Sequence, residues 1–169
     1  MSYLCQGGRV VSEPSVDQYR PVQDGLRAAG FYLDRSGQRL VSLLVVADGI
    51  VLSLLSHDLR RADEGVLLTH DDLRDLFMQA RAARGAAGNT PPPRRVDPIF
   101  PTGYEDFLRA LGDAAARQNW PALRLLRVGD EAILRFGPAI SRREMALKAR
   151  DVEGILNRAF QQRGHGPLS

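Results

Sequence analysis

The chain has 169 residues, of which 44% are hydrophobic and 25% charged, a composition typical of a globular protein that buries a core. Its longest apolar stretch, 40–55, is interrupted by Asp48-Gly49 and is shorter than the roughly 20 residues of a membrane-spanning helix, so we expect no membrane partner. The formal charge is +3, with Lys148 the only lysine among 23 basic residues, and this small excess points to an anionic partner only weakly.

Residues 1–18 are expected to form an N-terminal extension. They contain neither a basic nor an apolar segment of the kind found in secretion signals, and we therefore expect a cytoplasmic location. The single cysteine, Cys5, cannot form an intramolecular disulfide and has no His or Cys near it at metal-ligand spacing. The sequence thus indicates no metal and no cofactor.

The first expected helix begins near Pro21, because proline suits the first helical turn, where its missing N–H has no intrahelical acceptor in any case. Two apolar runs, 40–46 and 50–55, follow it. They flank Asp48-Gly49, a pair typical of tight turns, and predict a β-hairpin. Both faces of this hairpin are apolar, so we expect both to be covered.

A short third strand is expected over 66–68, because the preceding glycine disfavours a helix there. A helix over 70–84 follows. Thr69 and Asp72 match a capping box at its start, and Gly85 is expected to end it. The next segment contains three consecutive prolines and predicts a stiff linker rather than folded structure.

The same order of elements is expected after the linker. Thr102 and Glu105 match a capping box at the start of a helix, and Gly129-Asp130 lies between two apolar runs of a second hairpin. Residues 145–147 predict a third strand, although the polar residues before them could instead cap a helix over 142–162. The last helix is expected over 150–162, with Gly164 as its end.

The two halves of the chain align with each other. With a shift of 82, 11 of the 31 ungapped positions from 24 to 54 are identical, and a shift of 79 aligns the last helices. We therefore predict an α+β fold in which two α-β-β-β-α units share a core about a pseudo-twofold axis, as a single-chain dimer. The expected units are repeat 1 (19–85), a Pro-rich linker (86–102), repeat 2 (103–164) and a tail (165–169).

The histidines do not indicate a catalytic site. His57 and His70 each precede an aspartate, and Ser56 precedes the first, but neighbours in sequence seldom form a catalytic triad. His165 lies in the tail, and Ala149 stands where the second repeat would match His70. The sequence also contains no glycine-rich phosphate loop, so we assign no catalytic residue and favour a protein that is not an enzyme.

Arginines of the second repeat are candidate contacts for an anion or a nucleic acid. Strand alternation puts Arg124 and Arg127 on opposite faces, and the interleaved aromatic residues typical of single-strand binding are missing. A solvated or salt-bridged surface is the alternative that we favour. The candidate residues are Arg124, Arg127, Arg135, Arg142 and Arg143.

The leading functional hypothesis is a binding or regulatory protein that presents a composite surface to a macromolecular partner, with a protein favoured as that partner. One alternative is nucleic-acid binding through the arginines of the second repeat, with affinity that falls as salt rises. A second alternative is a small-molecule enzyme or sensor with its site between the repeats. Homo-oligomerisation stays open.

Overall fold

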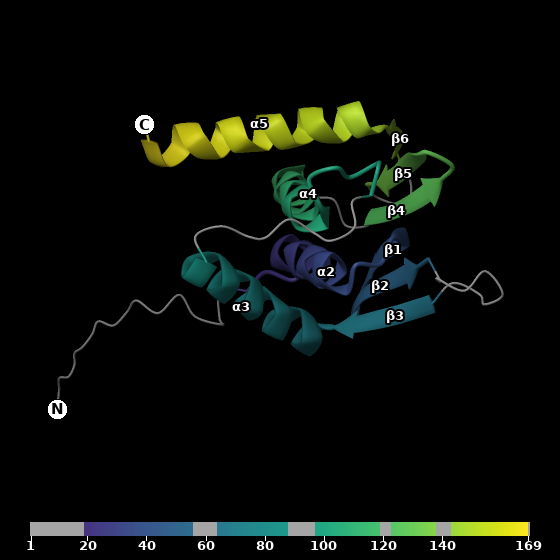
Figure 1. Ribbon diagram of the computed structural model, residues 1–169, viewed down its shortest axis with the longest axis horizontal. Coiled ribbons are helices and arrows are strands. Elements are labelled where there is room, and N and C mark those ends of the chain that lie inside the picture. Colours follow the sequence, from purple (N-terminus) through teal and green to yellow (C-terminus); the bar gives the residue numbers. More distant parts are fainter. Residues whose placement is uncertain (1–18, 56–63, 88–96, 119–122, 138–142, 169) are drawn as a thin grey trace.

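The structure is a computed structural model that describes residues 19–55, 64–87, 97–118, 123–137 and 143–168. It confirms the α+β class, with a six-stranded antiparallel sheet and helices to one side of the strands (Figure 1). The elements are α2 (Gln23–Ser36), β1 (Leu40–Val46), β2 (Gly49–Leu54), β3 (Glu64–Thr69), α3 (His70–Ala87), α4 (Tyr104–Gln118), β4 (Leu123–Val128), β5 (Glu131–Phe136), β6 (Arg143–Leu147) and α5 (Ala149–Leu168).

The strand order is β3-β2-β1-β4-β5-β6, so each hairpin carries its third strand on the outside. The two hairpins meet edge to edge through β1 and β4, where Leu43 pairs with Leu125 and Ser42 with Leu126. Both hairpins and both third strands are confirmed. The alternative of one helix over 142–162 is wrong for 143–147, because β6 is paired with β5 along its length and α5 begins only at Ala149.

Both hairpins turn through glycines that have positive φ angles. Gly49 has φ 151°, and a Cβ atom there would lie 2.0 Å from the carbonyl oxygen of Leu68. Gly129 has φ 65°, the left-handed region that glycine adopts without steric cost. The turn residues recognised in the sequence therefore have a direct geometric role.

Helices α2 and α4 cross at very short distance above the centre of the sheet. A Cβ atom on Gly30 of α2 would lie 2.6 Å from the Cα of Glu105, and one on Gly112 of α4 would lie 2.7 Å from the carbonyl oxygen of Gln23. Only glycine allows the two backbones to approach this closely. Beneath the helices, alternate residues of the four inner strands point into the core, as Leu43 and Leu125 do with at most 2% exposure.

Two expected helix ends are wrong. Helix α3 continues past Gly85 to Ala87, and α5 continues past Gly164 to Leu168. A glycine inside a helix costs only about 1 kcal/mol relative to alanine, which does not suffice to end a helix that its neighbours favour. None of the helices in the described ranges has the length and hydropathy that crossing a membrane requires.

The expected linker is folded at its C-terminal end. Asp97, Ile99 and Phe100 are all at most 3% exposed, and the Phe100 ring lies 5.3 Å from that of Tyr104 and 5.1 Å from that of Phe107. Burial of Ile99 and Phe100 favours a folded arrangement for this end of the expected linker. Residues 88–96, which hold the proline run, lie outside the described residues, as do Cys5, Ser56 and His57.

The two expected capping boxes have different outcomes. In the first, the Thr69 hydroxyl accepts from Asp72 N at 3.2 Å and the Asp72 carboxylate accepts from Thr69 N at 3.0 Å, which confirms it. The second, at Thr102 and Glu105, is wrong. The Glu105 carboxylate turns away to bind arginines of α2 and α3, and the start of α4 is capped from another helix.

Candidate functional site

The sheet face that points away from the helices is exposed. Leu44 and Val51 retain 37% of their accessible surface and Leu67 retains 49%. The expectation that both faces of the first hairpin would be covered is therefore wrong for the described part of the chain. The physical reason is that the hairpins pair edge to edge and form one wide sheet, so that only one face receives helices.

Apolar side chains from both hairpins form a strip on this open face that shifts by two residues at the centre of the sheet. In one half, Leu67 pairs with Val51 and Val51 with Leu44. In the other half, Leu126 pairs with Ile133 and Ile133 with Ala146. Where β1 pairs with β4, Leu44 lies opposite Arg124 and Leu126 opposite Ser42, so the two triplets are offset by two residues and adjoin diagonally. At about 4.8 Å per strand they span roughly 24 Å across the sheet. We call this set the apolar strip: Leu44, Val51, Leu67, Leu126, Ile133 and Ala146.

Polar residues flank the apolar strip on both sides. Ser42 and Ser53 pair with each other on one side. On the other side, Arg124 pairs with Arg135, whose guanidinium forms an ion pair with Glu144. Arg124 is exposed and has no ion pair with any described residue. Among the described residues, one flank of the strip therefore carries a positive charge with no ion pair.

The structure separates the candidate arginines. Only Arg124 and Arg135 share the open face, whereas Arg127 points to the helix side, so the expected alternation of Arg124 and Arg127 is confirmed. Arg143 is exposed near the edge of the sheet, opposite Phe136 in β5, and Arg142 lies outside the described residues. The five arginines therefore do not form one common surface among the described residues.

Arg127 belongs to a buried polar cluster at the junction of β1, β4 and α4. Its side chain is 18% exposed, binds the Asp97 carboxylate and donates from Nε to the carbonyl oxygen of Leu40 at 2.8 Å. The Tyr104 hydroxyl donates to Asp97 and accepts from Leu40 N at 3.0 Å. Burial, together with the hydrogen bond to Asp97, raises the pKa of Tyr104 above its usual value. Arg127 therefore stabilises the fold. The sequence did not indicate this role, because Asp97 was expected to belong to the linker.

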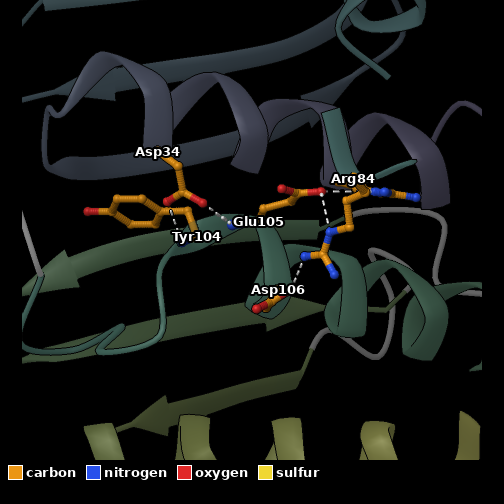
Figure 2. A network of polar contacts seen from close by, with 6 residues as sticks. Asp34, Arg84, Tyr104, Glu105 and Asp106 are labelled. Atoms are coloured by element: carbon orange, nitrogen blue, oxygen red, sulfur yellow. Dashed lines mark hydrogen bonds and ion pairs between the residues drawn. The ribbon is translucent and has the colours of Figure 1, made fainter. Parts of the chain in front are cut away.

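A second polar network joins the three helices α2, α3 and α4 (Figure 2). The Asp34 carboxylate of α2 accepts from Tyr104 N at 2.7 Å and Glu105 N at 3.1 Å, and so caps α4. Glu105 is 4% exposed and binds Arg27 at 3.1 Å. Arg84 of α3 lies 3.9 Å from Glu105 and 2.7 Å from Asp106. Because every charge in this network has a partner, its role is to orient the helices.

The Asp34 carboxyl gives this network a pH dependence. Burial raises its pKa from 3.8 to about 6, against the opposing effect of the two backbone hydrogen bonds. The folded state thus holds the proton more tightly than the unfolded chain, so the contribution of Asp34 to stability is complete below about pH 4 and is lost as the pH rises through about 6.

We therefore expect Asp34→Asn to remove a decline in stability between about pH 4 and pH 6, because the amide does not titrate. Urea unfolding of both proteins at several pH values measures this difference. Parallel profiles for the wild type and the variant would show that Asp34 has no part in the pH dependence.

Two hollows lie on the helix side of the molecule. The first, of about 580 Å³, lies among α2, α3 and α4, and two of its four arginines, Arg20 and Arg27, are paired with Asp24 and Glu105. The second, of about 560 Å³, lies between the β4–β5 turn and the start of α5. The sequence did not predict the position of either hollow. It indicated only that a site could form between the repeats.

Comparison of the chain with protein-family models, curated proteins and solved structures finds no match.

Proposed function

We propose that this chain is a non-enzymatic binding protein that presents the open face of its sheet to a helical segment of another protein. The observation that carries the proposal is the apolar strip, in which Leu44, Val51 and Leu67 are each at least 37% exposed. Exposed contiguous apolar surface is typical of interaction sites, since leaving it in water is unfavourable. The cytoplasmic location expected from the sequence is part of the same proposal.

The shape and charge of the strip suit an amphipathic helix with acidic flanks. A span of roughly 24 Å corresponds to a helix of about 16 residues at 1.5 Å rise per residue. Helices of this chain already pack on the other face of the same sheet (Figure 1). A carboxylate beside the apolar stripe of the partner would lie near Arg124, which lacks an ion pair within the described ranges.

The proposal includes the internal duplication, because both halves contribute three residues to the strip. The shift of 82 relates Leu43 to Leu125, and the β1–β4 register is centred on this pair. The same shift relates Gln23 to Glu105 and Gly30 to Gly112, which contact one another reciprocally across the α2–α4 crossing. Reciprocal contacts of this kind are expected about a twofold axis and support repeats over 19–85 and 103–164 joined by the segment 86–102.

Fluorescence anisotropy with a labelled 16-residue helical peptide, bearing a leucine stripe flanked by glutamates, tests the proposal. We expect it to bind the full chain and Leu67→Ser to weaken binding about tenfold or more, because burying a leucine contributes about 1.5–3 kcal/mol. Met78→Ser, which removes an apolar side chain of 38% exposure from α3, is the matched control and should leave binding unchanged.

A charge-reversed peptide and a measurement of self-association test the proposed site further. A peptide with lysines in place of the glutamates should bind more weakly to the wild type and better to Arg124→Glu. Equal binding of both peptides by all variants would refute the proposed site, as would self-association of the chain through this face in sedimentation velocity.

The nucleic-acid alternative has less support. Arg127 is engaged with Asp97 inside the fold, and Arg124 and Arg143 lie on different faces of the sheet. A test of this alternative therefore needs Arg124→Ala and Arg143→Ala, since loss of Arg127 would disturb the fold itself.

A further inference from the structure

We propose that the hollow between the β4–β5 turn and the start of α5 binds a small organic phosphate. This site is independent of the apolar strip, which lies on the other face of the sheet. Its volume is about 560 Å³, enough for a small metabolite. It is lined by Arg39, Pro98, Ile99, Arg127, Gly129, Asp130, Lys148, Ala149 and Arg150.

The lining carries four cationic side chains and one acidic one. Two of the cations are compensated, because Arg127 binds Asp97 and Lys148 lies 3.5 Å from Glu131. Arg39 and Arg150 have no ion pair with any residue that the structure describes. Two guanidinium groups that have no ion pair within the described ranges therefore line one hollow.

Arg39 provides a second observation that points to an anionic ligand. Its Nε atom is buried and has no hydrogen-bond partner in the described part of the chain. Buried donors are nearly always satisfied in folded proteins, because leaving one unpaired is unfavourable. An anionic oxygen in the hollow would provide the acceptor that this donor lacks.

A comparison within the molecule explains why the hollow exists. At the start of α3, His70 extends to the neighbouring hairpin turn, where its Nε2 lies 2.7 Å from the carbonyl oxygen of Ala47. At the start of α5 the first residue is Ala149, as His70 is the first residue of α3, and Ala149 lines the hollow together with Gly129 of the other turn. Alanine has no group that could fill this space, and the hollow stays open.

The chemistry of the lining indicates the class of ligand. Guanidinium groups bind phosphate oxygens through two parallel hydrogen bonds, and an ammonium adds a point charge. Pro98 and Ile99 form an apolar wall beside these cations. A phosphate ester with a small apolar group would match both parts of the hollow.

Titration of the full chain with phenyl phosphate, followed by ¹⁵N–¹H correlation spectra, tests the proposal. We expect saturable shifts of the Gly129, Ala149 and Arg150 amides, and none on titration with phenol. Absence of saturable shifts at these amides up to about 10 mM would refute the site. Shifts confined to the other hollow, among Arg20, Arg27 and their neighbours, would refute it as well.

Two variants test the two arguments separately. Arg150→Ala removes one uncompensated cation and should weaken binding about tenfold or more, whereas Arg158→Ala on the exposed face of the same helix should not. Ala149→His introduces the side chain that fills the corresponding place near α3 and should abolish binding. Wild-type affinity in Arg150→Ala would refute the assignment even if Ala149→His failed to fold.

Discussion

Replacing Gly30 with alanine should lower the free energy of unfolding by about 3 kcal/mol, the upper range for an overpacked core. The added Cβ would lie 2.6 Å from the Cα of Glu105 and 2.8 Å from its nitrogen. These are backbone atoms of α4, which cannot rotate away as the end of a flexible side chain can. Helices α2 and α4 would have to separate, and their buried contacts with the sheet would loosen. Gly112→Ala should act in the same way, through Gln23.

Chemical denaturation followed by circular dichroism measures this effect, and Gly154→Ala in α5 is its matched control. A Cβ atom at Gly154 would meet only Arg158 Nη1, at an ordinary contact distance of 3.5 Å. Alanine is the better helix former, so this variant should gain about 0.5–1 kcal/mol. If Gly30→Ala and Gly154→Ala changed stability alike, the close crossing of α2 and α4 would not exist in solution.

Arg127→Ala should destabilise the protein by about 3–5 kcal/mol, the usual cost of removing one partner of a buried ion pair. The Asp97 side chain is 2% exposed and would lose its only ion-pair partner among the described residues. The carbonyl oxygen of Leu40 would lose the Arg127 donor as well. Because this cluster joins β1 and β4, its loss should weaken the centre of the sheet.

Arg124→Ala provides the comparison, because Arg124 belongs to the same strand and is exposed on the open face. Its loss should change stability by no more than about 0.5 kcal/mol. The double variant Arg127→Ala with Asp97→Ala should be less destabilised than the sum of the single variants, since it removes the unpaired carboxylate together with the cation. Equal stability of Arg124→Ala and Arg127→Ala would contradict the buried cluster.

These predictions separate the residues that maintain the fold from those available to a partner. The buried clusters around Asp97 and Glu105 hold strands and helices together and leave little freedom for contact with a ligand. Arg124 and the apolar strip on one face, and Arg39 with Arg150 on the other, are the groups that the described structure leaves uncompensated. A functional study should begin with those groups.

The sequence by itself determined the local elements. Apolar runs on either side of Asp48-Gly49 and Gly129-Asp130 predicted both hairpins, and Thr69 with Asp72 predicted the start of α3. These signals lie within a few residues of one another, where side-chain alternation and turn geometry act directly on the backbone. The local signals at residues 142–149 suit either a strand or a helix, so the sequence left both alternatives open there.

Only the tertiary structure decided how these elements combine. Asp34 caps a helix that begins 70 residues later, and Asp97 binds an arginine 30 residues away, so no local pattern could reveal either role. The edge-to-edge pairing of β1 with β4 leaves one sheet face open, whereas the apolar pattern of the first hairpin indicated that both faces would be covered. Hydrophobicity shows that a side chain favours burial, but the global packing of the chain decides which of these side chains can be buried together.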